Sequence, residues 1–292
     1  MSTTFCHYCY SEKLHFGRFR EYFFCKVCKS LGSKRNFSEK DLSIYYGSYY
    51  GHGNLSIPKL VKDRLRSQIQ HLEKYRSKEG TFLDIGFGAG ALLEAAESLD
   101  WNVFGTEISE SAIQSVRDKN WQVKLGDFNP HMFQVEFDVV CLMETIEHLA
   151  DPESIIKKIY QKVRPGGVLF GTTPNSSSLN RRILNEYWSI LGVPEHLNLA
   201  SKAGLSSLLY RNGFRKVSIK SSGFNPFDLI LKFKSLGGQS AKSESLSGRV
   251  DFGYNLNEKM FSSVFLSSVR ASVQNSLNLF NLGDSLVFTA EK

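Results

Sequence analysis

The side chains best suited to chemistry lie in one short segment, Met143-Glu-Thr-Ile-Glu-His-Leu149. It carries two carboxylates and an imidazole, on Glu144, Glu147 and His148. Residues three or four positions apart share a face when they are helical, so these groups can point at one place. Two mechanisms fit them. His148 can be a general base that removes a proton from an acceptor hydroxyl, or the three groups can hold a divalent cation that binds and acidifies that hydroxyl.

A glycine-rich turn, Asp84-Ile-Gly-Phe-Gly-Ala-Gly90, precedes this segment. Residues 81–85 are apolar and β-favouring and predict a buried strand, whereas residues 89–99 have apolar positions at helical spacing. Glycines let a ligand approach the backbone, and a helix N-terminus offers it unpaired N–H groups. Asp84 can accept hydrogen bonds from a ligand hydroxyl or ammonium group. The pattern predicts a ligand-binding turn, although a purely structural turn has the same appearance.

A second carboxylate favours the ligand-binding interpretation. Residues 101–106 predict a second strand that ends in Glu107. This residue comes about 20 positions after the first glycine, where a carboxylate can meet a ribose diol. Residues 123–126 predict a third strand with Asp127 just beyond it.

Two Cys-x2-Cys pairs, Cys6 with Cys9 and Cys25 with Cys28, are separated by fifteen residues near the N-terminus. Four thiolates at this spacing can close a tetrahedral site, which is how structural Zn²⁺ is held. A segment this small has too little core to fold alone, so the metal would supply much of its folding free energy. We therefore expect structural zinc. The fifth cysteine, Cys141, lies in an apolar strand and is expected to be an inert core residue.

The elements that must position these groups alternate between strand and helix, which predicts an α/β fold with ligands outside the carboxyl ends of the strands. Asp84, Glu107 and the 143–149 segment all lie at such ends. Ser109, Asp151 and Ser201 are expected to cap helices. The remaining predicted elements are strands over 137–142, 168–173, 214–220 and 284–290, and helices over 58–76, 152–163 (stopped by Arg164-Pro-Gly-Gly167) and 202–212.

Taken in order, these motifs resemble those of class I S-adenosylmethionine (SAM)-dependent methyltransferases of the ubiquinone type (methyltransferase-23-like). The resemblance covers residues 81–220 and the last ten. It implies a Rossmann-like seven-stranded, mostly parallel sheet with helices on both faces and an antiparallel last strand. A nicotinamide dehydrogenase would more typically carry Gly-x-Gly-x-x-Gly, where this chain has Gly-x-Gly-x-Gly. The motifs concerned are Asp84–Gly90, Glu107, Gly126-Asp127, Phe137-Asp-Val-Val140 and Arg164-Pro-Gly-Gly167.

The resemblance also implies roles for single residues. The glycine turn and Asp84 would cradle the methionine part of SAM, Glu107 would hold the ribose, and Asp127 with Phe128 would flank the adenine. Phe87 stands where many relatives carry cysteine, and its side chain is expected to pack outward. The residues expected to bind the cofactor are Asp84, Gly86, Gly88, Gly90, Glu107, Ile108, Asp127, Phe128 and Met143.

The 143–149 segment resembles two kinds of relative. Ubiquinone-type O-methyltransferases carry a similar Glu-x-x-Glu-His and are metal-linked. Small-RNA 3′-end 2′-O-methyltransferases use that triplet with a later histidine, for which His196 is the candidate. Glu-His-Leu also occurs in class I enzymes where no metal is implied. The catalytic candidates are therefore His148, Glu144, Glu147 and His196, and a divalent cation at the first three, an acid/base role for His148 and a structural role all stay open.

The net charge of +7 is distributed unevenly over the 292 residues. Residues 1–80 hold 15 Lys/Arg and 7 Asp/Glu, whereas the remaining residues hold 21 and 22. This bias favours an anionic acceptor or partner near the N-terminal part, and a solvated basic surface is an equally good interpretation. No apolar run resembles a signal peptide or a membrane span, so a cytoplasmic protein is expected.

We expect three parts: a zinc-ribbon-like module over 1–35, a Tyr/Gly-rich connector over 36–57 and a methyltransferase domain over 58–292. The connector tyrosines can form a flap over the site or pack against the domain. Within the domain, residues 224–281 form an insertion, and apolar spacing over 258–280 predicts an amphipathic helix. That helix is interpreted as a lid, a homodimer contact or a helix packed on its own domain.

The expected function is SAM-dependent transfer of a methyl group, most plausibly to oxygen, on a small or carrier-linked acceptor such as a sugar or polysaccharide precursor or a quinone-like molecule. The four-cysteine module ahead of this domain also resembles that of deoxysugar C-methyltransferases, which makes a nucleotide-linked sugar or a cell-surface polysaccharide precursor an option for the acceptor. The alternative is an RNA methyltransferase that uses the zinc module and basic N-terminal part as an RNA grip, although the charge bias is modest for that role. A binding protein with a degenerate fold is disfavoured by the intact glycine turn and Glu107.

Overall fold

The computed structural model describes residues 5–38, 41–42, 45, 59–225, 229 and 274–292. The predicted tyrosine-rich segment is outside these residues from position 46 to 53, and so is the predicted helix over 258–280 up to position 273. Of the part of that helix that is described, residues 274–279 are helical and residue 280 is in a turn.

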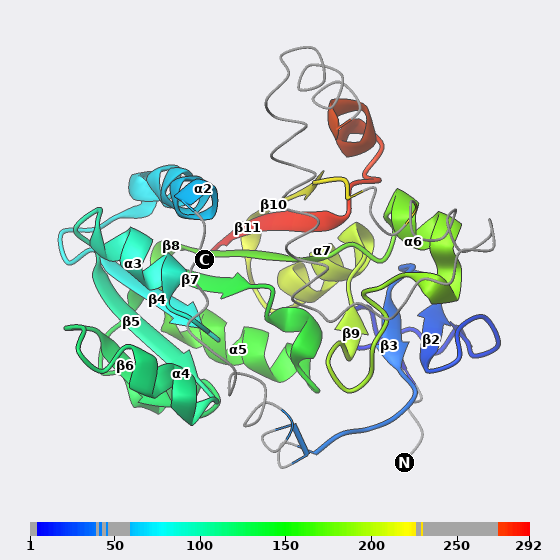
Figure 1. Cartoon of the computed structure of the whole chain (residues 1–292), viewed down its shortest axis with the longest axis horizontal. Coiled ribbons are helices and arrows are strands. Elements are labelled where there is room, and N and C mark those ends of the chain that lie inside the picture. The colour runs from blue at the N-terminus through cyan, green and yellow to red at the C-terminus, as the bar shows by residue number, and fades with distance from the viewer. Residues whose placement is uncertain (1–4, 39–40, 43–44, 46–58, 226–228, 230–273) are drawn as a thin grey trace.

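A seven-stranded sheet in the order β10-β11-β8-β7-β4-β5-β6 forms the centre of the molecule (Figure 1). The pairs β4–β5, β4–β7, β5–β6 and β7–β8 are parallel, and β11 runs antiparallel between β8 and β10. This topology confirms the predicted Rossmann-like, mostly parallel sheet. The strands are β4 (Thr81–Ile85), β5 (Asn102–Glu107), β6 (Gln122–Leu125), β7 (Phe137–Met143), β8 (Val163–Pro174), β10 (Arg215–Ser222) and β11 (Ser285–Glu291).

Helices cover both faces of this sheet, because alternate strand residues are apolar on both sides. In β7, Val139 and Cys141 pack on the α2 and α3 face, whereas Val140 and Leu142 pack on the α5 and α7 face. Cys141 is fully buried in that core, which agrees with its predicted inert role. The α-helices are α2 (Lys59–Gln70), α3 (Ala91–Glu97), α4 (Glu110–Ser115), α5 (Pro152–Lys162), α6 (Leu179–Leu184) and α7 (Lys202–Arg211), and the 3₁₀ helices are η1 (Glu73–Tyr75), η2 (Pro130–Met132), η3 (Ile146–His148) and η4 (Asn185–Tyr187).

The helix starts follow local sequence. The side chains of Ser109, Asp151 and Ser201 accept hydrogen bonds from backbone N–H groups of the first turns of α4, α5 and α7, so all three predicted caps are confirmed. Among the described residues, no helix combines the length and the apolar character that a membrane span requires.

One boundary differs from the prediction. The helix α5 ends at Lys162, but β8 begins at Val163, so the Arg164-Pro-Gly-Gly167 motif is part of the strand rather than a separate stop. The backbone of Lys292 explains this extension, since its C=O accepts from the N–H of Gly166 at 3.0 Å and its N–H donates to Gly167 at 3.1 Å. Backbone hydrogen bonds to Lys292, at the end of β11, thus hold both glycines in the sheet, with Gly166 in a left-handed conformation (φ +77°).

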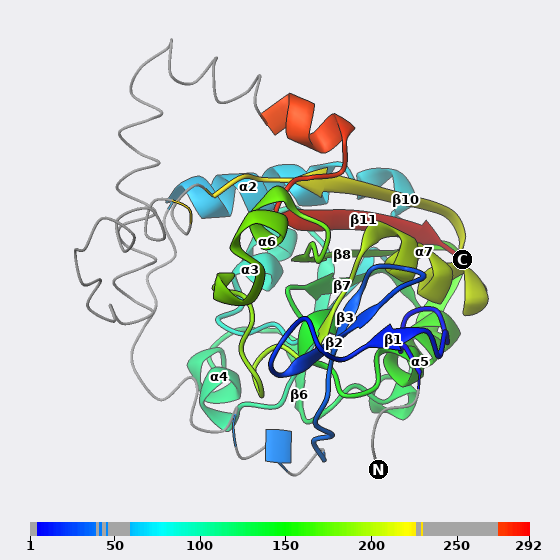
Figure 2. The same cartoon turned by 90° about the vertical axis from the view of Figure 1, so that its right-hand side faces the viewer.

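A second, four-stranded sheet joins the N-terminal module to the main domain. Its order is β1-β2-β3-β9, with β1 (Leu14–His15), β2 (Tyr22–Cys25) and β3 (Leu31–Ser33) from the module and β9 (Asn198–Leu199) from the main domain. Figure 2 shows the module strands beside α7, where Cys28 and Tyr8 pack so closely on Gly204 that a Cβ there would meet both. The main domain therefore completes the module's sheet.

Candidate active site

The glycine turn between β4 and α3 is built largely from left-handed backbone. Gly86, Gly88 and Gly90 have φ of +74°, +55° and +76°, values that side chains with a Cβ rarely adopt. A Cβ on Gly86 would lie 3.0 Å from Thr145, beside the cavity described below, whereas a Cβ on Gly90 would lie 2.8 Å from the ring of Trp121. Gly86 therefore gives space at the cavity, and Gly90 gives space for packing between helix and core.

Phe87, between these glycines, does not pack outward as predicted. Its side chain is 5% exposed and belongs to the core on the α3 face. Gly105 in β5 makes room for it, because a Cβ at that position would come 2.7 Å from the Phe87 ring. Phe87 and Gly105 are 18 positions apart, so the local sequence around Phe87 did not indicate that Gly105 would make room for its ring.

Glu107 holds the turn in place. Its Oε2 accepts from the N–H of Gly88 at 2.9 Å, and its Oε1 accepts from those of Ile108 and Ser109 at 2.8 and 3.0 Å. The carboxylate also contributes to the cavity wall. The residue predicted to grip a ribose is therefore at the cavity and is oriented by three backbone donors.

Asp84 is the least satisfied polar group near the turn. Its side chain is 2% exposed, and its Oδ1 has no hydrogen-bond partner. Burial raises the pKa of this carboxyl well above its ordinary value, and the nearby charge of Glu107 raises it further. A buried carboxyl oxygen without a partner calls for a donor, which the ammonium group or a hydroxyl of a ligand can supply.

A cavity of about 430 Å³ extends from this crossover to the ends of β7 and β8. Its size suits a ligand as large as a nucleoside. Of the predicted cofactor-binding residues it is lined by Gly86, Glu107, Ile108, Asp127 and Phe128. Phe128 is buried and Asp127 is exposed. The residues Asp84, Gly88, Gly90 and Met143 are not among those that line it.

The acidic end of the cavity follows β7. Glu144 has a left-handed backbone (φ +49°), and Glu147 lies in η3 with only 1% of its surface exposed. Glu147 Oε2 accepts from the Thr173 hydroxyl at 2.9 Å, while its Oε1 has no hydrogen-bond partner. Burial raises the pKa of Glu147 well above its ordinary value, and the Glu144 carboxyl raises it further. Glu147 therefore favours a proton or a cation at this point.

Two histidines face each other beside Glu147. The rings of His148 and His196 have centroids 4.9 Å apart at 30°. His148 Nδ1 is 2.6 Å from the carbonyl oxygen of Glu195, and His196 Nδ1 is 2.7 Å from that of Ile190. A carbonyl oxygen only accepts, so each Nδ1 carries the proton and each Nε2 carries the lone pair.

Both imidazoles favour the neutral form. Burial lowers the pKa of His148, and the charge of His196 lowers it further. Burial is also the main cause that lowers the pKa of His196. Ligand atoms of Glu147, His148 and His196 all lie within 4.8 Å of one another. These three residues thus form a group suited to a base or a divalent cation, and the group that could hold a cation includes His196 rather than the predicted Glu144.

Residues far away in sequence support this group. The Tyr22 hydroxyl, from β2 of the module, donates to the carbonyl oxygen of His196 at 2.6 Å and accepts from the N–H of Gly192 at 3.1 Å. The N–H of Leu197 donates to the carbonyl oxygen of Glu147 at 2.7 Å. Sequence reasoning missed Tyr22 and Thr173, because no local motif marks either residue.

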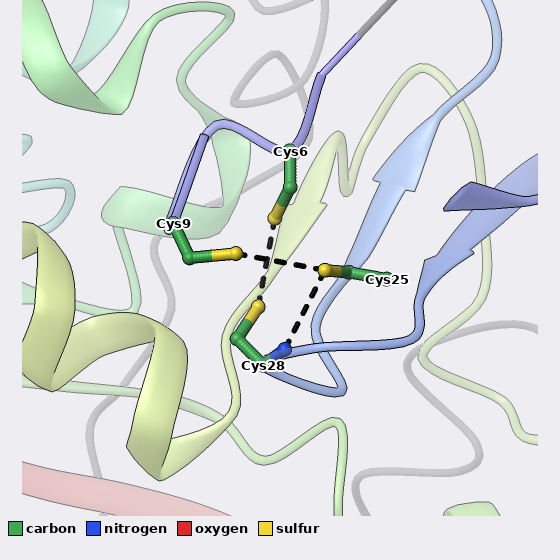
Figure 3. A group of neighbouring side chains, drawn as sticks. All are labelled: Cys6, Cys9, Cys25 and Cys28. Atoms are coloured by element: carbon green, nitrogen blue, oxygen red, sulfur yellow. Dashed lines mark hydrogen bonds between the residues drawn. The ribbon is translucent and has the colours of Figure 1, made fainter. Parts of the chain in front are cut away.

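The four module cysteines converge on one point (Figure 3). The Sγ atoms of Cys6 and Cys28 are 3.5 Å apart, and those of Cys9 and Cys25 are 3.6 Å apart. Tetrahedral Zn²⁺ with Zn–S distances of about 2.3 Å places its sulfurs about 3.8 Å apart, so the geometry fits. The hydrogen bond between Cys6 and Cys28 lowers the pKa of Cys28 to about 5 and raises that of Cys6, so Cys28 is the thiolate of this pair.

A family profile described as "Methyltransferase domain" matches residues 59–219. The ubiquinone biosynthesis O-methyltransferase of Hydrogenovibrio crunogenus is 30% identical over 144 residues, which make up 46% of this chain and 58% of that protein. The enzyme of the same name from Azoarcus sp. is 28% identical over 167 residues, covering 51% of this chain and 70% of that protein. The chain therefore spans less than two thirds of the first of these relatives.

Among solved structures, a SAM-dependent methyltransferase from Archaeoglobus fulgidus has a TM-score of 0.50 at 19% identity, covering 85% of this chain and 99% of that one. At this level of identity the likeness shows a shared fold.

Proposed function

Because this chain belongs to the methyltransferase-domain family, we propose that it transfers the methyl group of SAM to an oxygen atom of a small or carrier-linked acceptor. The observation that carries the proposal is one cavity that joins Gly86 and Glu107 to Glu147, His148 and His196. The two relatives named ubiquinone biosynthesis O-methyltransferase support oxygen as the methylated atom and a quinone-like acceptor.

The turn side of the cavity fits SAM, which when bound supplies an electrophilic methyl group on a sulfonium. Gly86 would leave space for the ligand, and the unpartnered Oδ1 of Asp84 would accept a hydrogen bond from its ammonium or hydroxyl groups. Glu107 would hold the ribose and Phe128 would pack on the adenine, both from the cavity wall.

The acidic side of the cavity would handle the acceptor's proton. His148 or His196 can take a proton from an acceptor hydroxyl on Nε2, because the backbone carbonyls hold the proton on Nδ1. The lowered pKa values keep both rings neutral and ready to accept at neutral pH. Glu147 would stabilise the imidazolium that results, since its Oε1 is 3.9 Å from His148 Nε2.

A divalent cation fits the same three residues and is the second mechanism. Carbonyl oxygens that fix the Nδ1 proton are a usual outer support of metal-binding histidines. A cation there would bind and acidify the acceptor hydroxyl. For the N-terminal module we propose a structural Zn²⁺ held by Cys6, Cys9, Cys25 and Cys28, whose sulfurs have the required spacing.

Labelled SAM incubated with the protein and a fractionated cell extract tests the acceptor class. We expect label in the small-molecule or carrier-linked fraction. Label in RNA would instead support the alternative in which the module grips RNA, and transfer to no fraction by a protein that binds SAM would contradict the enzyme proposal. A homodimer contact and cytoplasmic location remain predictions.

A further inference from the structure

Four cationic side chains lie where the N-terminal module meets α6, outside the candidate active site. Arg18 and Lys29 come from the module, and Arg181 and Arg182 come from α6. The ring of Phe24 lies among three of them. Its centroid is 5.6 Å from Cζ of Arg18, 5.9 Å from Cζ of Arg181 and 5.8 Å from Nζ of Lys29. The charges of Arg18 and Arg182 both act on Arg181. We call these four residues the cationic cluster.

Within the described part of the chain, no carboxylate forms an ion pair with any member of the cationic cluster. Their hydrogen-bond partners are neutral oxygens. The partners are Asn185 Oδ1 for Arg18 (3.3 and 3.2 Å), the carbonyl of Lys26 for Lys29 (2.6 Å), that of Ser176 for Arg181 and that of Ser177 for Arg182 (3.0 Å).

Arg181 is the residue that this arrangement leaves least satisfied. Its side chain is 4% exposed, and one terminal guanidinium nitrogen is buried with no hydrogen-bond partner. Burial lowers its pKa to about 10, and the neighbouring arginines add to the effect. Buried cations are normally paired with an anion, and buried N–H groups normally find an acceptor. Both requirements are met if an anion completes the cluster.

The chemistry of the cluster selects phosphate over a single carboxylate. Guanidinium groups bind phosphate oxygens through paired N–H donors, and four cations suit a group with two or more negative charges. Arg18 and Asn185 hydrogen-bond across the boundary between module and η4, so the two halves of the cluster are held together.

The cluster is connected to the cavity along the chain. The segment that carries Arg181 and Arg182 is bounded in sequence by Pro174 and Ile190, and both of these residues line the cavity. A ligand bound at α6 would therefore contact a segment whose two ends both belong to the cavity wall.

We propose that the cationic cluster binds the phosphate or diphosphate group of a carrier-linked acceptor. The acceptor would be anchored there through a group away from its methylated atom. This proposal rests on the proposed function for its acceptor class, but anion binding at the cluster does not itself require methyl transfer.

Calorimetric titration of the full chain with inorganic pyrophosphate tests the proposal. Arg18→Ala and Arg182→Ala change exposed residues and should leave the fold intact. Each should weaken pyrophosphate binding by about tenfold, the effect of losing one charge-assisted contact. Lys78→Ala is the matched control, because Lys78 is an exposed cation just ahead of β4, at the amino ends of the parallel strands. The affinity of this variant for pyrophosphate should equal that of the wild type.

SAM binding, measured on the same variants, should be unchanged, which separates a failure of this proposal from a failure of the proposed function. No pyrophosphate binding by the wild-type chain, or equal binding by all variants, would overturn the proposal. A single-stranded RNA oligomer is titrated in parallel. If it needs Arg18 and Arg182 and loses affinity steeply with salt while pyrophosphate does not bind, the cluster is a nucleic-acid site and the proposal is wrong.

Discussion

Gly86 combines a left-handed backbone with a place in the cavity wall, so it is the best single position at which to block the expected cofactor. Arginine there should cost about 1–2 kcal/mol in backbone strain and fill the cavity beside Thr145. We expect Gly86→Arg to keep its circular dichroism spectrum and to abolish SAM binding by calorimetry.

Gly223→Arg is a matched control for that variant. Gly223 has a similar φ of +78°, but a Cβ there would meet nothing within 4 Å. Gly223→Arg should carry the same backbone strain as Gly86→Arg, and its affinity for SAM should equal that of the wild type. Normal SAM affinity in Gly86→Arg would show that the cofactor binds elsewhere.

Asp138 is the residue whose charge should matter most for stability. It is fully buried and accepts from the N–H groups of Ser77 and Thr81 at 3.0 and 2.8 Å, and from Arg164. Burial by itself raises the pKa of Asp138, but the hydrogen bonds from Arg164, Thr81 and Ser77 outweigh it and lower the pKa below its ordinary value. Asp138→Asn should therefore cost about 3 kcal/mol at neutral pH in urea unfolding.

The sign of the pH dependence follows from that lowered pKa. The charged form stabilises the fold above the pKa of the unfolded chain, and this contribution is lost as pH falls through the pKa of the folded state. Asp138→Asn should reduce the acid-range slope of the unfolding free energy, whereas Asp118→Asn, with 93% of its side chain exposed, should not. An unchanged slope in Asp138→Asn would refute the assigned role.

Local motifs predicted much of the candidate site. Glu147, His148 and the glycine turn are adjacent in sequence to strand ends, so the rule that ligands bind at those ends located them. Tyr22 could not be found this way, because its hydroxyl reaches His196 across 174 positions. Phe87 was predicted wrongly because its position depends on the absence of a side chain at Gly105.

At the scale of elements, β9 connects the module to the proposed catalytic group. β9 begins two residues after His196 and pairs with β3, while the Tyr22 hydroxyl of β2 donates to the His196 carbonyl oxygen. The sequence predicted the seven main strands, of which β4 and β7 are largely apolar runs with clear boundaries. β9 has two residues and carries no periodic signal, so its pairing could not be foreseen.

Tyr22→Phe tests whether this connection positions His196. The ring stays in the core, and two hydrogen bonds are lost, at a cost of about 1 kcal/mol each. We expect an unchanged Kd for SAM, a kcat lowered by about tenfold and a shifted pH profile of methyl transfer. Tyr210→Phe is the control, because Tyr210 is 48% exposed on α7. An unaltered kcat and pH profile in Tyr22→Phe would mean that β9 alone holds His196.

At the scale of the whole molecule, the module and the main domain share one core. Cys6, Tyr8, Cys25 and Cys28 belong to the same apolar cluster as Leu205 of α7. The sequence predicted the four-cysteine site from its spacing, but not that the module would pack on α7 and pair with β9, because docking depends on contacts such as the one at Gly204.

Cys25→Ser should remove the metal and loosen the module without unfolding the seven-stranded sheet, which pairs independently of β3. We expect zinc to be absent by emission spectroscopy, SAM binding to persist and methyl transfer to fall, since β9 loses its partner. Cys141→Ala changes a cysteine outside the cluster and should retain zinc. Unchanged zinc content in Cys25→Ser would defeat the metal assignment.

The pairing of β3 with β9 has a consequence for synthesis on the ribosome. Leu31 emerges early, but its strand partner Leu199 is translated only after most of the central sheet. Until then β3 of the nascent module has an unpaired edge, and unpaired strand edges can pair with the wrong strand or with another chain. We expect the growing polypeptide to depend on a chaperone during this interval.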